Sequence, residues 1–398
     1  MSLRLLHTAD WHVGRTLRGR SRLDEHEATL EQLVALAEDQ QVGLVVVAGD
    51  LFDTAAPAPD AERLVYRTLL QLAGDDRQVL IIAGNHDHPR RWNAVAPVLD
   101  LARIHVRPFV VAPAQGGVIE LEITGTPTCI ALLPWLSQRH AVSADDLLSR
   151  DADQHNQTYL DRMRRVAKAL CAPFSADRAN LVVGHLTAVG ATLGGGERLA
   201  HTIFDYAVPA SIFPPTAGYV ALGHLHRHQR VDGPAPTYYS GSPLQLDFGE
   251  GDNDPTAVIV ELAPGRPARL EAIELDAAPR LRTLTGSVTE LELLARDTGN
   301  AHLRLVVRER HRAGLADELR ERFSRAVEVR IEPVEVPGDE GGRGIAAPPR
   351  RLGRSPYELF GEFMAQQSVI DSRVAALFAE LVEQDSSEDH DAGGDNAP

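Results

Sequence analysis

Seven residues of types that commonly bind metal ions follow five short apolar runs of this sequence. One run, residues 44–48, ends at Gly49-Asp50, and the other runs end in the same way at Asp, Asn or His. Mixed carboxylate, amide and imidazole donors suit manganese or iron and also admit zinc. Two such ions can activate a water molecule and clamp the oxygens of a phosphoester during in-line displacement. We therefore predict a two-metal phosphoesterase site with the ligands Asp10, His12, Asp50, Asn85, His185, His224 and His226.

The spacing of these residues suggests individual roles. Asp10 and His12 are two positions apart, so their side chains point the same way if the strand geometry continues. Asp50 has two carboxylate oxygens and is the natural bridge between two ions. His86 follows a ligand and would lie on the other side of an extended backbone, which makes it a candidate to protonate the leaving oxygen. Asp87 could hold the imidazole of His86 in one tautomer.

Two basic stretches flank the predicted site. Arg15 and Arg18 follow the first ligand pair, and Arg90 and Arg91 follow the third motif. Next to a phosphodiester site, arginines of this kind are expected to contact the phosphate backbone, which fixes position without reading base sequence. The alternative is that they are solvated loop charges.

Buried strands are the elements expected to position these residues. Apolar runs of this length, bounded by glycine, are typical of buried strands, and ligands at the carboxyl ends of such strands converge on one crevice. Helical spacing within 30–37 and 61–72 alternates with the runs at 44–48 and 79–83, which indicates a βαβαβ order and a mostly parallel sheet. Further strands are predicted at 118–123, 128–133, 181–183, 219–222 and 256–261. We predict an α/β fold in which two packed sheets are flanked by helices, over residues 1–275.

The pattern changes after this domain. Residues 280–335 predict a small α+β domain, and 336–355 are a linker rich in Gly and Pro. Ser355-Pro356-Tyr357-Glu358 combines an N-cap, a first-turn proline and a glutamate three residues after the cap. The segment 356–384 is therefore expected to be helical, with an apolar face that awaits a partner or folds back on its own domain. Residues 385–398 are expected to be a disordered acidic tail.

Composition excludes several classes of protein. The chain has 398 residues and only two cysteines, Cys129 and Cys171, so a disulfide scaffold is not expected. It contains neither the pattern of a signal peptide nor an apolar run of about 20 residues, and we expect a cytoplasmic protein without a membrane partner. The net charge of −16 lowers the expectation of nucleic-acid binding without excluding it, because phosphate responds to the local field.

Several motifs carry a family resemblance. The ligand motifs are Asp10-x-His12, Gly49-Asp50, Gly84-Asn85-His86-Asp87, Gly184-His185 and Gly223-His224-x-His226. This series resembles the calcineurin-like metallophosphoesterases. Four further motifs are His12-Val13-Gly14-Arg15, Gly49-Asp50-Leu51-Phe52-Asp53, Tyr239-Ser240-Gly241-Ser242-Pro243 and Tyr357-Glu358-Leu359-Phe360. With them the chain resembles, within that superfamily, the SbcD family of bacterial DNA repair nuclease subunits over nearly its whole length, except the linker and the tail.

The resemblance implies two manganese ions. Asp10, His12, Asp50 and His226 would hold one ion, and Asp50, Asn85, His185 and His224 the other. It also implies a 3′→5′ double-strand exonuclease and single-strand endonuclease that acts in DNA repair, recombination and replication, close to the nucleoid. Residues 280–335 would be a capping domain that steers DNA. The helices from 356 would bind a coiled-coil ATPase of the SbcC type, and two nuclease subunits would pair within a heterotetramer. Archaeal and eukaryotic relatives usually have His where this chain has Asp53.

Two other functions use parts of the same sequence. A phosphatase or cyclic-nucleotide phosphodiesterase would use the same metal ions on a small phosphoester, but it would need neither the second domain nor the helical segment. A scaffold that recruits the ATPase without catalysis is disfavoured by the complete set of ligands. DNA hydrolysis with manganese would distinguish the nuclease from the other two functions, and hydrolysis confined to small phosphoesters would favour the phosphatase or phosphodiesterase.

Overall fold

The structure is a computed structural model that describes residues 2–136, 152–197, 207–332 except 311 and 313, and Phe360. The chain divides into two compact units, Met1–Val334 and Glu335–Pro398. The predicted linker at 336–355, the helical segment at 356–384 apart from Phe360, and the tail at 385–398 lie outside the described residues. None of the helices in the described ranges combines the length and the apolar character that crossing a bilayer requires.

The first sheet contains the predicted βαβαβ strands. Its members are β1 (Leu3–Thr8), β4 (Leu44–Val47), β5 (Gln78–Ile82), β6 (Ile104–Arg107), β13 (Thr256–Leu262) and β14 (Arg269–Glu274). Their order across the sheet is β14-β13-β1-β4-β5-β6. Strands β1, β4, β5 and β6 are parallel, whereas β13 and β14 are antiparallel to their neighbours. The carboxyl ends of β1, β4 and β5 therefore meet at one edge.

The second sheet has the same size. Its members are β7 (Val118–Ile123), β8 (Thr126–Leu133), β9 (Ala179–His185), β10 (Tyr219–Gly223), β11 (Gln229–Val231) and β12 (Thr237–Tyr239). The order is β11-β12-β10-β9-β8-β7, and β8, β9, β10 and β12 are parallel. Strands β9 and β10 thus bring the ends of two more predicted ligand runs together.

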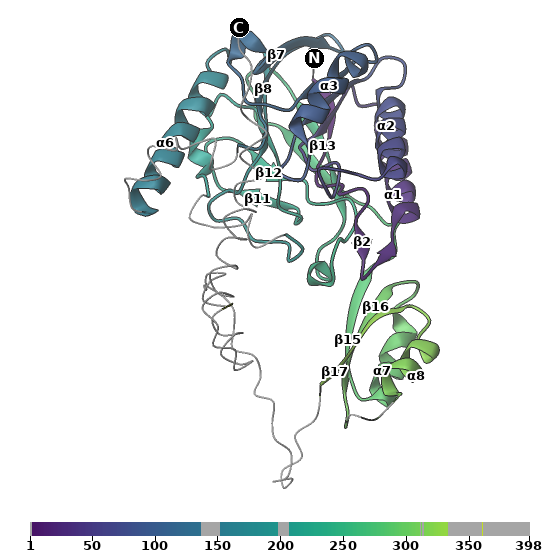
Figure 1. Ribbon diagram of the computed structural model, residues 1–398. Helices are drawn as coiled ribbons and strands as arrows, with labels where there is room; N and C mark the ends of the chain where they lie inside the picture. The colour runs from purple at the N-terminus through teal and green to yellow at the C-terminus, as the bar shows by residue number, and fades with distance from the viewer. Residues whose placement is uncertain are drawn as a thin grey trace, which may run out of the picture. The chain divides into compact units, whose positions relative to one another are not determined.

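Alternation of side chains along the strands builds the layers. In β4, Val46 faces the core between the two sheets, while Val45 and Val47 face the outer core. Strands buried on both faces are continuously apolar, which explains why these runs show no polar alternation. The outer core of the first sheet is covered by α1 (Leu23–Asp39), α2 (Pro59–Ala73) and α3 (Pro89–Asp100). Helix α6 (Ala152–Leu170) covers the second sheet on the opposite flank (Figure 1).

A small lobe follows at residues 281–332. Its elements are β15 (Leu281–Gly286), α7 (Val288–Leu294), β16 (His302–Arg308), α8 (Leu315–Arg322) and β17 (Ala326–Glu332). The three strands form a parallel sheet in the order β15-β16-β17. Leu291, Leu305 and Leu319 belong to its separate apolar core. The sequence predicted a small α+β domain over 280–335, whereas the three parallel strands make this lobe a βαβαβ unit.

The two-sheet sandwich flanked by helices confirms the predicted fold. Six elements of the sandwich, α3, α6, β6, β11, β12 and β14, were not predicted. Helix α3 contains Pro97 and buries only Trp92 and Leu99, so its helical period is weak. Strand β14 lies at a sheet edge with mostly exposed side chains. A short hairpin, β2 (Thr16–Leu17) and β3 (Arg20–Ser21), follows the first ligand pair.

Candidate metal centre

The two sheets contribute ligands to one place. Asp10, Asp50 and Asn85 lie just beyond the ends of β1, β4 and β5, and His185 and His224 lie at the ends of β9 and β10. The predicted convergence at the carboxyl ends of parallel strands is thus present in both sheets. Asp10, His12, Asp50, His185, His224 and His226 are all at most 5% exposed. Most of the predicted ligands are therefore buried polar groups, which require partners.

The backbone at these turns is strained. The φ angles are 54° at Asp10, 47° at His12, 54° at Asp50 and 104° at His224, all in the left-handed region. Non-glycine residues rarely adopt such angles, and residues that do cluster at functional sites because their surroundings hold them. The strand geometry expected to continue through Asp10 and His12 ends at Thr8. Both side chains nevertheless face the site, because the turn re-aims them.

Asp50 lies at the centre of the cluster. Its Oδ2 is 3.7 Å from Nε2 of His12 and 3.4 Å from Nε2 of His185. Asn85 Oδ1 is 3.0 Å from Nε2 of His185 and 2.8 Å from Nδ1 of His224. The backbone N–H of His224 also donates to both carboxylate oxygens of Asp10, at 3.0 Å each. Asp50 thus lies between the donors of the first and the second sheet.

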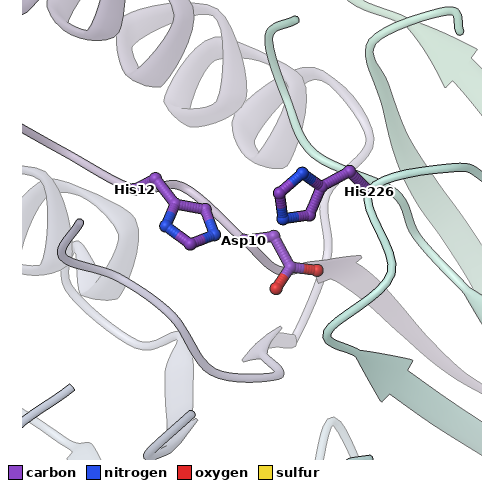
Figure 2. Close-up of side chains that lie close together, drawn as sticks. All are labelled: Asp10, His12 and His226. Carbon is purple, nitrogen blue, oxygen red and sulfur yellow. The ribbon is translucent and has the colours of Figure 1, made fainter. Parts of the chain in front are cut away.

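Ligand atoms gather in overlapping groups. Asp10, His12 and His226 form one group, and Asp50, His185 and His224 form another, with the ligand atoms in each group within 4.8 Å of one another. In Figure 2 the imidazoles of His12 and His226 both lie next to Asp10. A further group joins His12, Asp50 and His86. His12 thus belongs to two of these groups, and so does Asp50.

The donor set fits a divalent metal ion. Nε2 of His12 is buried and has no hydrogen-bond partner among the described residues. A buried imidazole nitrogen without a partner is costly unless it binds something. It faces a carboxylate oxygen of Asp50 at a distance too long for a hydrogen bond. Carboxylate, imidazole and amide donors around such a gap are a typical arrangement for divalent transition metal ions.

Burial and neighbouring charges shift the pKa values of the residues in this cluster. Burial disfavours the ionised form of Asp50, but His185 and His12 outweigh it and hold the pKa of Asp50 well below its usual value. Burial raises the pKa of Asp10 to about 7, even though His185 and His226 act in the opposite direction. Burial also lowers the pKa of His12 to about 4, so this imidazole is neutral at pH 7. A neutral imidazole is the form that binds metal ions.

Contacts behind the ligands orient them. Oε1 of Glu250 lies 2.7 Å from Nδ1 of His226, and the Nδ1 of His185 lies 2.7 Å from the carbonyl oxygen of Ala48. Oδ1 of Asp53 lies 3.6 Å from Nδ1 of His12. Hydrogen-bond partners such as Glu250 and the Ala48 carbonyl fix the tautomer of a metal-binding histidine, whereas the contact of Asp53 with His12 is longer than a hydrogen bond. Sequence reasoning noted Asp53 without a role and missed Glu250, because nothing in the spacing links Glu250 to His226.

His86 lies beside the cluster, and its surroundings correct one prediction. Its backbone N–H donates to Oδ1 of Asp50 at 2.8 Å, and its Nδ1 lies 2.8 Å from the carbonyl oxygen of Asp53. The carbonyl can accept only from a protonated Nδ1, which assigns this tautomer. The imidazole is therefore held by Asp53 and not by Asp87, which was expected to hold it. Asp87 is buried and accepts instead from the backbone N–H groups of Gly84, Leu51 and Phe52.

The predicted substrate-binding arginines have different surroundings. Arg15 pairs with Asp53 at 3.1 Å, and Arg91 pairs with Glu62 at 2.5 Å. Arg18 reaches into the small lobe, where its Nε donates to Glu328 at 2.7 Å. Arg90 is exposed at the start of α3. Arg15 therefore lies next to the site. Arg18 instead takes part in a contact between the sandwich and the small lobe.

Trp135 is an aromatic neighbour of the site that sequence reasoning missed. Its ring centroid lies 5.0 Å from that of His224 and 6.0 Å from that of His185. Its backbone N–H donates to the carbonyl oxygen of Ala83, near the end of β5. The residue follows the end of β8, so the rule that placed the ligands at strand ends would also have pointed to it.

Comparisons with known proteins agree with this geometry. The model of the family described as calcineurin-like phosphoesterase matches residues 3–228. The SbcD subunit of the nuclease SbcCD from Bacillus subtilis (strain 168) is 33% identical over 288 residues, which are 70% of this chain and 71% of that protein. Its namesake in Rhodobacter capsulatus is 31% identical over 397 residues, covering 90% of this chain and 93% of that protein. The namesake in Escherichia coli (strain K12) is 29% identical over 302 residues, or 73% and 72% of the two chains. This chain belongs to the calcineurin-like phosphoesterase family and, within it, to the family of the SbcD subunits of SbcCD nucleases.

Proposed function

We propose that this protein is the nuclease subunit of a DNA repair and recombination complex and hydrolyses phosphodiester bonds with two divalent metal ions. The observation that carries this function is the meeting of both sheets around Asp50, in a chain whose relatives are named nuclease subunits. The activities expected are 3′→5′ double-strand exonuclease and single-strand endonuclease.

The residues of the site have different roles in the proposed reaction. Asp10, His12, Asp50 and His226 would hold one ion, and Asp50, Asn85, His185 and His224 the other, with manganese as the proposed metal. Two bound divalent ions supply an activated water molecule and stabilise charge on the phosphate oxygens. The Asp53 carbonyl holds Nδ1 of His86, so Nε2 is the nitrogen through which His86 would pass a proton to the leaving oxygen. Asp87 keeps the turn that carries Asn85 and His86 in place.

The substrate arginines remain part of this proposal. Arg15 lies next to the cluster through Asp53, and Arg90 and Arg91 are exposed on the first turn of α3. We propose that Arg15, Arg90 and Arg91 contact the DNA backbone. Arg18 would contribute only if DNA displaced its ion pair with Glu328. A phosphatase or cyclic-nucleotide phosphodiesterase acting on a small phosphoester is the second candidate, but the names of the relatives do not favour it.

The partners follow from the family. We propose that a coiled-coil ATPase of the SbcC type binds the segment 356–384, and that two nuclease subunits pair within a heterotetramer in the cytoplasm, at the nucleoid. Two apolar side chains at the end of α3 are exposed: Val98 is 68% and Leu101 84% exposed. Such exposed apolar side chains support the binding of a protein partner at α3. The small lobe would serve as the capping domain that guides DNA.

A cleavage assay tests the proposed function. Purified protein with manganese should shorten linear double-stranded DNA, and chelation should stop the reaction. The His86→Ala variant should lose about 10²- to 10⁴-fold in rate, because it lacks the proton donor. It should still bind two manganese ions, because the proposed ligands remain.

Metal analysis of the same variant is the control. Loss of one ion from His86→Ala would reassign His86 as a ligand. Hydrolysis by the wild-type protein of small phosphoesters alone, with intact DNA, would favour the phosphatase or cyclic-nucleotide phosphodiesterase instead.

A further inference from the structure

Residues 245–250, which we call the junction segment, form one of the contacts between the sandwich and the small lobe, beside the direct pairs Arg18–Glu328 and Glu25–His302. The junction segment ends in a single 3-10 turn, Phe248–Glu250. The first residue of the segment, Gln245, is 3% exposed. The side chain of Gln245 accepts from the backbone N–H of Leu281, at the start of β15, at 2.6 Å. Its amide donates to the carbonyl oxygens of Glu250 and Asn253 at 3.0 and 2.9 Å. One buried side chain therefore ties the first strand of the small lobe to the backbone of Glu250.

A second contact with the small lobe is ionic and aromatic. The guanidinium carbon of Arg304, on β16, lies 4.4 Å from the ring centroid of Phe248, within the range of a cation–π contact. Arg304 also lies 3.7 Å from Asp247 and 2.8 Å from Glu328 of β17. Arg18 of the β2–β3 hairpin pairs with the same two carboxylates, at 3.3 and 2.7 Å. The junction segment is thus held between two arginines, one from each lobe.

Apolar packing encloses this network. Leu17, Phe248 and Leu281 form a buried cluster against which Val327 packs. These residues come from the β2–β3 hairpin, the junction segment and the first and last strands of the small lobe. Arg304 is only 14% exposed at its side chain, so solvent screens its contacts less than those of a surface ion pair.

The other end of the junction segment reaches the metal centre. Glu250 is 1% exposed, and its Oε1 lies 2.7 Å from Nδ1 of His226. Its Oε2 accepts from the backbone N–H of Leu246 at 2.7 Å, so the carboxylate is held by the segment itself. A Cβ added at Gly249 would lie 2.1 Å from the carbonyl oxygen of Gly195. The turn between Phe248 and Glu250 therefore has little room to absorb a displacement.

We propose that the junction segment transmits the position of the small lobe to the proposed metal ligand His226. Phe248 and Arg304 are then positioning residues: they hold the turn whose last residue, Glu250, orients the imidazole. Any partner that moves the small lobe, such as DNA seated on it, changes how tightly the ion next to His226 is bound. This inference rests on the proposed two-metal nuclease function.

Manganese titration of the full-length protein, followed by the electron paramagnetic resonance signal of the free ion, tests the coupling. Glu250→Gln is the reference variant and should lower the binding affinity for one of the two ions by roughly 10- to 100-fold. Arg304→Ala and Phe248→Ala should lower the affinity for the same ion by roughly three- to tenfold, because they act through Glu250. Arg304→Lys, which keeps the positive charge, should recover part of the affinity. DNA cleavage by Arg304→Ala should be reduced at limiting manganese and restored at saturating manganese.

Arg308→Ala is the matched control. Arg308 lies on the same strand as Arg304, but it pairs with Glu332 at 3.5 Å on an exposed surface. Its variant should bind both ions like the wild-type protein. The inference is overturned if Arg304→Ala and Phe248→Ala bind both ions as Arg308→Ala does, or if saturating manganese fails to restore cleavage. A wild-type protein that binds two ions and leaves DNA intact would instead overturn the proposed nuclease function.

Discussion

Individual residues in the metal centre are held in conformations that they would not adopt alone. Four proposed ligands, Asp10, His12, Asp50 and His224, have positive φ angles. Each such residue costs of the order of 1–3 kcal/mol, which the packing of two sheets must offset. The residues behind the ligands matter for the same reason, because they fix the imidazole rings in these turns.

Asp53 is the clearest such residue. Burial works against its ionised form, but His12 and Arg15 outweigh it and lower the pKa of Asp53 to about 2, so the carboxylate is charged next to His12. Asp53→Ala should weaken manganese binding by roughly 10- to 100-fold, because the imidazole of His12 loses the carboxylate that lies 3.6 Å from its Nδ1. The backbone carbonyl that holds His86 remains, and the variant therefore isolates the side chain. Asp53→Asn should lose less, since it keeps an acceptor oxygen; unchanged affinity in Asp53→Ala, measured by calorimetry, would contradict this role.

His26 gives a prediction about acid stability. Burial lowers its pKa from 6.5 to about 4. Since the unfolded chain binds the proton more readily, His26 stabilises the fold above pH 6.5 and this contribution is lost as the pH falls towards 4. The loss amounts to about 3 kcal/mol for one fully buried group. His26→Asn keeps a donor for the carbonyl of Arg22, which His26 Nδ1 contacts at 2.9 Å. Urea unfolding of this variant between pH 6.5 and 4 should show a shallower decline; equal slopes would refute the assignment.

At the scale of elements, the strands bring the ligands together only because their ends approach closely. Gly84 follows β5, and a Cβ added there would lie 2.1 Å from Oδ1 and 2.5 Å from the backbone nitrogen of Asp50. Gly49 follows β4, and its added Cβ would lie 2.3 Å from Nδ1 of His185. The glycines at the ends of these runs therefore permit the contact between turns that forms the centre.

Gly84→Ala tests this requirement. The clash is with backbone as well as side chain, so the turn must shift and the variant should lose roughly 1–3 kcal/mol of stability or more. It should also lose metal affinity, because Asp50 is displaced. Gly299→Ala is the control: Gly299 has a positive φ, unlike Gly84, so its substitution strains the backbone, but nothing lies within 4 Å of an added Cβ. Thermal unfolding and manganese titration of the two variants should separate them, and a Gly84→Ala protein with wild-type metal affinity would contradict the argument.

At the scale of the whole molecule, the chain joins a compact unit, Met1–Val334, to a second unit, Glu335–Pro398. All proposed ligands lie in the first unit, together with the contacts that orient them. Basal hydrolysis and recruitment of the ATPase are therefore expected to be separable.

Deletion of 356–398 should leave manganese-dependent DNA cleavage within about twofold of the full-length rate, because the ligands and their supports remain. The same deletion should abolish co-purification with the coiled-coil ATPase. Pull-down of the co-expressed partner and a parallel cleavage assay measure the two effects. Undiminished co-purification would place the docking surface elsewhere.

The sequence alone determined the layered α/β fold and the seven candidate ligands, because buried strands and the residues at their ends leave a local pattern. It could not reveal that Glu250 supports His226, that Asp53 rather than Asp87 holds His86, or that Arg18 pairs with Glu328. Those contacts join residues with no fixed spacing, up to 310 positions apart, and only the packing of both sheets and the small lobe brings them within bonding distance. Local pattern decides which residues end a strand; tertiary packing decides which side chains then meet.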